Sequence, residues 1–186
     1  MNLESLVTWL GDTKGSIALH ESLHLYTYVE AAHVLGITLF AGTIAMVDLR
    51  LLGVSFKAVP VSQMNARILP WTVAGFVLMI ATGVVLFYAI PVRTFHSPWF
   101  RLKMILMVVA AVNIAWFTFH VEKSRGQWDT AARPPAAART AAVISLVMWV
   151  GVIVTGRMIA YNWLDCDKPQ PAWVQAFASC KTMAQQ

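Results

Sequence analysis

Charged residues are scarce in this chain. Of its 186 residues, 12% are Asp, Glu, Lys or Arg and 58% are hydrophobic, whereas about 25% of the residues in a soluble domain are charged. The mean hydropathy is correspondingly high, at +0.62. This deficit excludes an ordinary soluble enzyme and predicts a membrane protein whose main partner is the lipid bilayer.

Signals for nucleic-acid binding and for secretion are also missing. The 14 Lys and Arg exceed the 9 Asp and Glu without forming a nucleic-acid-binding motif, and in membrane proteins such an excess usually reflects loop topology. The N-terminal sequence MNLESLVTWLGD has no basic region and no small-residue cleavage site before an apolar core. We therefore expect no nucleic-acid partner and no removable signal peptide.

Four apolar segments are long enough to cross a bilayer, because each supplies the roughly 20 residues that span about 30 Å of hydrocarbon. They cover residues 23–53, 69–90, 100–121 and 141–163. Residues 1–22 combine apolar and polar faces, as an amphipathic interfacial helix does, and residues 164–186 form a polar tail. The sequence predicts an all-α fold, a single four-transmembrane-helix bundle with an N-terminal interfacial helix and a short C-terminal tail.

Loop charges and cysteines predict the orientation of this bundle. The first and third loops carry more Lys and Arg than the second, which favours a cytoplasmic position for those two loops. Cys166 and Cys180 both lie in the tail, and a disulfide between them requires an oxidising compartment. Both signals place the two termini in the periplasm. The alternative is a cytoplasmic tail with two unpaired thiols.

Residues 20–24 read HESLH, the HExxH signature of zinc metalloproteases. The motif precedes the first span, and in the longer version of the pattern its third-ligand position falls on Glu30, without the turn glycine. A catalytic zinc needs three protein ligands, so we do not interpret the chain as a zinc protease. His20 and His24 are interpreted as interfacial residues. The alternative makes one of them a haem or metal ligand, with His96 as its mate.

Polar residues inside the spans form two predicted clusters at different depths. Charged groups in a bilayer are costly and usually mark function or face the bundle interior. The outer cluster contains Glu30, His33, Lys103, Arg157 and Asn162. The inner cluster contains Asp48, Arg50 and His120, with Asn113 on the same helical face as His120.

Haem b is the cofactor that such a small helical bundle most readily holds, with imidazole as an axial ligand and arginine near the propionates. His33 is the best candidate ligand within the spans, and Arg157 lies near its depth. His120 lies roughly 20 Å away in depth, at 1.5 Å per helical residue, and cannot bind the same iron. The candidates for the second ligand are His24, His96, Met79 and Met107. Alternatively, His33 only hydrogen-bonds a neighbouring helix.

Several stretches resemble a family of small, uncharacterised bacterial four-helix inner-membrane proteins. They are HVLGITLFAGTIAMVDLRLLG (33–53), ILPWTVAGFVLMIATGVVLF (68–87), FRLKMILMVVAAVN (100–113) and SLVMWVGVIVTGRMIAY (145–161). The resemblance covers roughly residues 30–163 and implies the fold and a bacterial inner-membrane location more than an activity.

A fainter resemblance points to haem-binding membrane proteins of the copper-resistance D and protoporphyrinogen oxidase types. It rests on His33-x-x-Gly36 and on Trp99-x-x-x-Lys103. His120 lies well beyond the position expected from the second type.

Two functions follow as hypotheses. The first is a membrane b-type cytochrome-like electron-transfer protein or subunit, which exchanges electrons with quinone and with a periplasmic redox partner or larger membrane complex. Glu30, Lys103 and Arg157 would then position a propionate or the quinone headgroup. The second is a cofactor-free accessory subunit or small transporter, with buried pairs Asp48–His120 and Glu30–Arg157. The five histidines favour the first.

Overall fold

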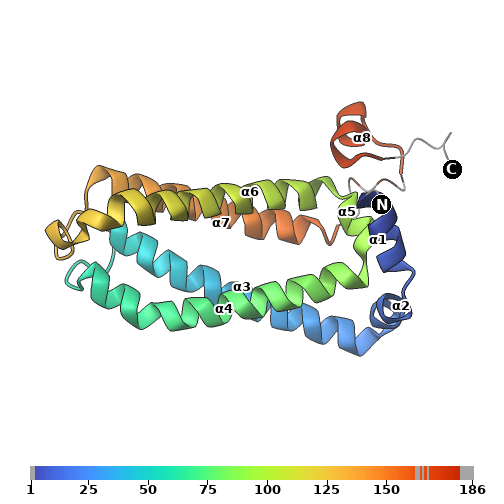
Figure 1. The fold of residues 1–186 in the computed structure, drawn as a ribbon, viewed down its shortest axis with the longest axis horizontal. Coiled ribbons are helices and arrows are strands. Elements are labelled where there is room, and N and C mark those ends of the chain that lie inside the picture. The colour runs from blue at the N-terminus through green and yellow to red at the C-terminus, as the bar shows by residue number, and fades with distance from the viewer. Residues whose placement is uncertain (1–2, 162–163, 165, 167, 181–186) are drawn as a thin grey trace.

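The computed structural model describes residues 3–161, 164, 166 and 168–180, and every regular element in this part of the chain is a helix (Figure 1). The elements are α1 (Leu3–Gly11), α2 (Lys14–Glu21), α3 (Leu23–Leu51), α4 (Val61–Ala89), α5 (Pro91–Phe95), α6 (Pro98–Trp116), the π-helical turn η1 (Phe117–Val121), the 3₁₀ segment η2 (Glu122–Gln127), α7 (Ala136–Met158) and α8 (Ala172–Ala178). The predicted all-α fold is confirmed.

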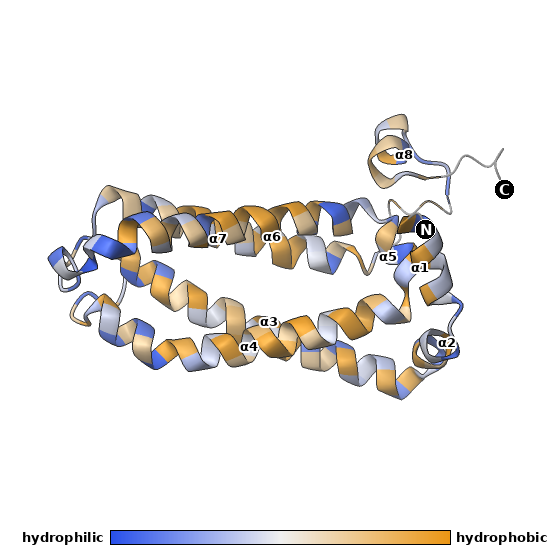
Figure 2. Ribbon diagram, in the orientation of Figure 1, coloured by the Kyte–Doolittle hydropathy of each residue, from blue (hydrophilic) through white to orange (hydrophobic). Residues whose placement is uncertain are grey.

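Four helical stretches are long and apolar enough to cross a membrane, which makes this a multi-pass membrane protein. They are Leu23–Leu51, Val61–Ala89, Pro98–Gln127 and Ala136–Met158. Hydrophobic residues run along all four (Figure 2). The second and fourth spans begin earlier than the sequence analysis places them, and α7 ends at Met158. Asn162 and Trp163, at the predicted end of the fourth span, lie outside the described residues.

The early start of α4 has a specific cause in a distant loop. The backbone N–H of Val61 donates to the carbonyl oxygen of Asp129 at 3.1 Å, and that of Ser62 donates to the Asp129 carboxylate at 2.7 Å. These bonds satisfy first-turn donors that a helix cannot pair internally. The helix then continues through Pro70, which lies on an exposed face.

The spans pair as two hairpins, α3 with α4 and α6 with α7 (Figure 1). Two glycines allow α3 and α4 to pack backbone against backbone. A Cβ atom at Gly36 would lie 2.9 Å from the Met79 nitrogen, and one at Gly75 would lie 2.7 Å from the Phe40 nitrogen. Small residues of this kind are what permit close helix approach in lipid.

The hairpins join in two places. At mid-bundle, Phe40 packs edge-to-face on Trp149 with 4.7 Å between ring centroids, in a cluster that also contains Met79, Ala110 and Val152. A second cluster, which includes Leu51, Val61 and Trp128, closes the end of the bundle where the first loop (between α3 and α4) and the third loop (between η2 and α7) lie. We call this the loop end. At the opposite end, here the terminal end, the two hairpins diverge (Figure 1).

Residues 3–21 form two short helices on the terminal end. The Ser16 hydroxyl donates to the Tyr88 carbonyl oxygen at 2.8 Å, and Thr13 Oγ1 lies 2.8 Å from the Tyr88 hydroxyl. The predicted interfacial segment is therefore docked against α4.

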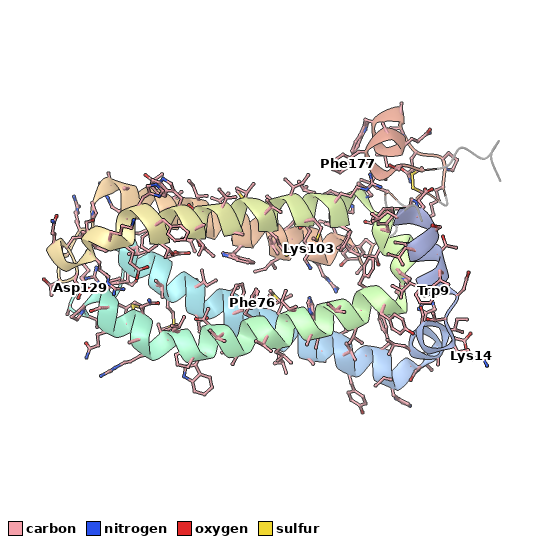
Figure 3. All side chains as sticks on the ribbon, viewed as in Figure 1. Trp9, Lys14, Phe76, Lys103, Asp129 and Phe177 are labelled. Carbon is pink, nitrogen blue, oxygen red and sulfur yellow. A yellow bond between two sulfur atoms is a disulfide. The ribbon has the colours of Figure 1, made fainter. Side chains whose placement is uncertain are left out.

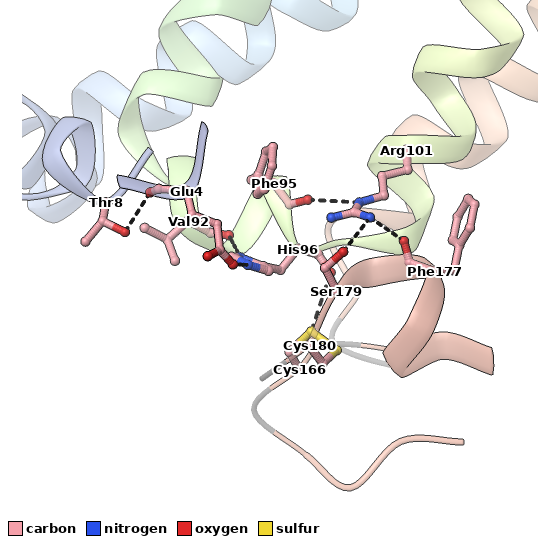
Figure 4. Close-up of polar contacts among 10 residues, drawn as sticks. All are labelled: Glu4, Thr8, Val92, Phe95, His96, Arg101, Cys166, Phe177, Ser179 and Cys180. Carbon is pink, nitrogen blue, oxygen red and sulfur yellow. Dashed lines mark hydrogen bonds and ion pairs between the residues drawn. A yellow bond between two sulfur atoms is a disulfide. The ribbon is translucent and has the colours of Figure 1, made fainter. Parts of the chain in front are cut away.

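The described part of the tail also attaches to this end of the bundle. Cys166 and Cys180 form a disulfide, and Arg101 donates to the Phe177 carbonyl and to Ser179 beside α8 (Figure 4).

Candidate functional site

A large cavity lies between the two hairpins at the terminal end. Its volume is about 930 Å³, at the upper end of the 300–1,000 Å³ range that is usual for ligand sites. Helices α3, α4, α5, α6 and α7 all contribute to its wall. The polar residues on that wall are Tyr26, Glu30, His33, Thr38, Arg93, Thr94, Ser97, Lys103 and Arg157. We refer to it as the terminal cavity.

His33 stands on the wall of the terminal cavity in a defined orientation. Its Nδ1 lies 2.9 Å from the Thr82 hydroxyl oxygen, and that hydroxyl donates its own proton to the Leu78 carbonyl at 2.6 Å. While Thr82 donates to Leu78, its oxygen accepts from His33, and the ring proton is then on Nδ1. The lone pair of a neutral histidine is then on Nε2, as a metal ligand requires.

The opposite helix leaves room for this ring because residue 83 has no side chain. A Cβ atom at Gly83 would lie 3.2 Å from His33 Cε1. That spacing is tighter than ordinary van der Waals contact, so a larger residue would push the imidazole out of its place. Gly83 and Thr82 together fix the position of His33.

Cationic side chains dominate the charge of the terminal cavity. Arg93, Lys103 and Arg157 line it, against the single carboxylate of Glu30 among the described lining residues. Lys103 reaches from α6 into the space between the hairpins (Figure 3), with its Nζ only 3.3 Å from where a Cβ of Gly156 would stand. With His33 neutral, this wall suits a ligand that carries negative charge.

Ser97 adds an unpaired polar group to the same wall. It is 3% exposed, and its hydroxyl oxygen finds no hydrogen-bond partner in the described part of the chain. It is also the N-cap of α6 without a capping side-chain bond. Free backbone N–H groups at a helix N-terminus attract anions. Ser97 and the start of α6 therefore strengthen the preference of the cavity for negative charge.

Of the predicted outer cluster, the structure brings Glu30, His33, Lys103 and Arg157 to one cavity. The predicted pair of Glu30 with Arg157 is not among the described contacts, and the Arg157 guanidinium instead lies 5.4 Å from the Tyr161 ring. Asn162, also placed in this cluster, lies outside the described residues.

The other predicted haem ligands lie elsewhere. His96 Nδ1 lies 2.9 Å from the Val92 carbonyl, and its Nε2 lies 3.5 Å from Glu4 (Figure 4). His120 is exposed and bonds the Trp116 carbonyl at 3.2 Å. His24 is exposed at the start of α3. Met79 and Met107 belong to the mid-bundle core.

The HESLH motif is split between two helices. Helix α2 ends at Glu21 and α3 begins at Leu23, with Ser22 as the cap between them. His20 and His24 are therefore not one turn apart on a single helix, as the protease motif requires. No group of three His, Cys, Asp or Glu among the described residues could hold a metal ion.

A second, smaller cavity of about 270 Å³ lies toward the loop end. Asp48 lines it, 5% exposed, with one carboxylate oxygen that has no hydrogen-bond partner within the described residues. Asn113 lines it too and donates to the Ala141 carbonyl at 2.9 Å. We call this the loop-end cavity.

The predicted inner pair of Asp48 with His120 is not among the described contacts. His120 does not line the loop-end cavity. Arg50 is fully buried and donates instead to the carbonyl oxygens of Val59, Asp129 and Ala131, at 2.7, 3.3 and 3.1 Å. These bonds tie the first loop to the third, so Arg50 has a structural role.

Four residues of this site were not predicted from the sequence: Thr82, Gly83, Arg93 and Ser97. A signal existed for Ser97, because Ser-Pro is a common start of a helix and helix starts bind anions. Thr82 and Gly83 carried no such signal, since Thr and Gly are ordinary residues of membrane helices.

A family model, that of DUF6644, a family of unknown function, matches residues 3–162. The match includes the four candidate spans, both cavities and the two N-terminal helices, and it ends before the cysteine tail. It agrees with the predicted resemblance to an uncharacterised family and carries no information on haem. No curated protein and no solved structure matches the chain.

Proposed function

Because the chain belongs to DUF6644, whose function is unknown, we propose a function from its own geometry: a membrane b-type cytochrome-like electron-transfer protein or subunit. Haem b would occupy the terminal cavity, with His33 as its axial ligand. The observation that carries the proposal is the bond between His33 Nδ1 and Thr82 at 2.9 Å. It leaves Nε2 as the free, ligating nitrogen on the wall of a large cavity.

Metal-binding histidines nearly always donate their other ring N–H to a hydrogen-bond acceptor, which fixes both tautomer and ring orientation. Thr82 supplies that acceptor, because its own proton is committed to Leu78. The same bond joins α3 to α4, as the structural alternative for His33 also expects, so the haem proposal depends in addition on the cavity that His33 lines. Gly83 supports the proposal by leaving space beside the ring.

The charge of the terminal cavity fits the two propionates of haem b. Lys103 and Arg157 line it from α6 and α7, and Arg93 from α5. Their positive charge would compensate the carboxylates within a region from which water is partly excluded. The unpaired Ser97 hydroxyl at the start of α6 offers a further hydrogen bond.

Haem, when bound, would supply a one-electron carrier. The chain would hold and orient it through His33, because the other four described histidines do not line the terminal cavity. Quinone and a periplasmic redox partner are the electron-exchange partners that we propose. The disulfide between Cys166 and Cys180 supports a periplasmic tail, since disulfides persist in oxidising compartments.

Haem titration of the purified full chain in detergent tests the proposal. We expect a Soret band that saturates at one haem per chain. His33→Ala should lower the affinity by at least tenfold, while His24→Ala and His120→Ala should leave it unchanged. Equal binding by all three variants, or no saturable binding by the unsubstituted chain, would remove the basis for the proposal.

A cofactor-free transporter or accessory subunit is the second candidate, and the buried Asp48 favours it. A carboxylate that is 5% exposed with an unpaired oxygen is costly within a bilayer and is usually kept for function. This candidate predicts a colourless protein in which Asp48→Asn, rather than His33→Ala, changes activity.

A further inference from the structure

We propose that the loop-end cavity binds a single Na⁺ ion, with Asp48 as its anionic ligand. This inference does not depend on haem in the terminal cavity. Asp48 is 5% exposed, and its unpaired Oδ2 is fully buried. A carboxylate oxygen in this environment needs a compensating positive charge, because the desolvation of an unpaired ion costs several kcal/mol.

Among the residues that the structure describes, no basic side chain supplies that charge to Asp48. The charged residues that line the cavity besides Asp48 are Glu122 and Arg125, and these two pair with each other at 2.6 Å. Arg50, two residues away in the chain, donates from Nε and Nη2 to loop carbonyls, and its buried Nη1 has no partner within the described residues, so it does not pair with Asp48. With Asp48 ionised, the described lining carries one uncompensated negative charge, which one monovalent cation would neutralise.

Neutral oxygen donors line the cavity from the three spans other than the one that carries Asp48. They are Asn65 and Thr72 from α4, Asn113 from α6, Thr118 from η1 and Ser145 from α7. The Asn113 amide nitrogen is committed to the Ala141 carbonyl, which leaves its oxygen as the available group. Carboxylate, amide and hydroxyl oxygens are the ligands of hard cations. With one carboxylate in the set, the charge balance favours Na⁺ over a divalent ion.

The helix beside the cavity is locally irregular. Residues Phe117–Val121 form a π-helical turn, of which Phe117 and Thr118 line the cavity. Such turns are rare and occur frequently at functional sites, where they re-aim side chains and backbone. The turn therefore lines the same cavity as the unpaired carboxylate, and the Glu122–Arg125 pair, which follows the turn in the chain, lines it too.

The test is thermal unfolding of the purified full chain in detergent, in NaCl against choline chloride at equal ionic strength. A ligand that binds only the folded state raises Tm with its concentration. We expect a saturable Na⁺-dependent rise in Tm for the unsubstituted chain and none for Asp48→Asn. Glu30→Gln is the matched control, a carboxylate of the terminal cavity whose loss should leave the Na⁺ response intact.

Identical melting curves in the two salts would overturn the proposal, as would a pH-dependent Tm that does not respond to Na⁺, the result expected if only a proton binds Asp48. A Na⁺-dependent rise in Tm that survives in Asp48→Asn would also overturn the proposal.

If Asp48→Asn does not fold, the same melting experiment is carried out on Ser145→Ala. We expect that variant to need a higher Na⁺ concentration for half of the rise in Tm. Haem binding should be unchanged in Asp48→Asn and the Na⁺ response unchanged in His33→Ala, so the two proposals fail separately.

Discussion

The two ends of the bundle are built in opposite ways. At the loop end, the fully buried Arg50 donates hydrogen bonds to three loop carbonyls. Asp129 caps α4, a helix of the other hairpin, and Trp128 is buried in the cluster that closes this end. At the terminal end the hairpins diverge around a cavity of about 930 Å³ whose polar groups are only partly paired.

This difference indicates a division of labour. The contacts at the loop end and at mid-bundle hold the two hairpins together, so the terminal end can keep an open cavity without loss of the fold. A site built this way has its side chains on rigid helices, which is how precise ligand geometry is maintained. Substitutions at the two ends should therefore have different consequences, on stability at one and on ligand binding at the other.

The largest effect is expected from Arg50→Met. This change removes three hydrogen bonds from a charged donor, each worth about 1.5–3 kcal/mol, and leaves the loop carbonyls unpaired. We expect the free energy of unfolding to fall by at least about 3 kcal/mol, measured as a loss of Tm in detergent. Arg157→Met, on an exposed arginine of the terminal cavity, should change it by less than about 0.5 kcal/mol. Equal losses in the two variants would contradict the division of labour.

Gly75→Ala should have the next largest effect. Its Cβ would lie 2.7 Å from the Phe40 backbone nitrogen, so α3 and α4 must separate, at a cost of about 1–3 kcal/mol. Gly42→Ala is the control, because a Cβ there meets nothing within 4 Å, and Ala favours the helix. A Tm for Gly75→Ala equal to or above that for Gly42→Ala would show that the close approach of the helices is unimportant.

Asp129→Asn should lower the free energy of unfolding by about 1 kcal/mol, as the loss of a helix cap does. It should also change how the stability depends on pH in the acid range. Hydrogen bonds from Ser62 hold the pKa of Asp129 below its usual value. Its contribution is therefore present above about pH 4, the unfolded value, and is lost as pH falls through the lower folded pKa. Melting curves from pH 7 down to pH 3 should converge for the two proteins. A constant difference over that range would contradict this assignment.

The smallest effect on stability is expected from Thr82→Val, which lies at the terminal end. The apo protein should melt within about 0.5 kcal/mol of the original, whereas haem affinity should fall about 10–100-fold, because the partner that orients His33 is lost. Thr43→Val, a threonine of α3 that bonds only its own helix, should change neither quantity. Unchanged haem affinity in Thr82→Val would show that the hydrogen bond has no part in the site.

The sequence predicted the spans well because apolar length alone decides what crosses a bilayer. It also grouped Glu30, His33, Lys103 and Arg157 by depth, and the structure brings these four to one cavity. It misplaced the start of α4, since the cap on that helix comes from Asp129, 67 residues further on. It paired Asp48 with His120 from depth alone, whereas helix rotation turns His120 outward and leaves the carboxylate facing other helices.

The most direct test of haem binding through His33 is a pyridine haemochrome assay on protein purified without added haem, from cells supplied with a haem precursor. We expect close to one b-type haem per chain for the unsubstituted protein, with a reduced-minus-oxidised difference spectrum that shows an α band. We expect almost none for His33→Ala purified in the same way. A colourless unsubstituted protein, or a His33→Ala variant with the same haem content, would contradict haem binding through His33.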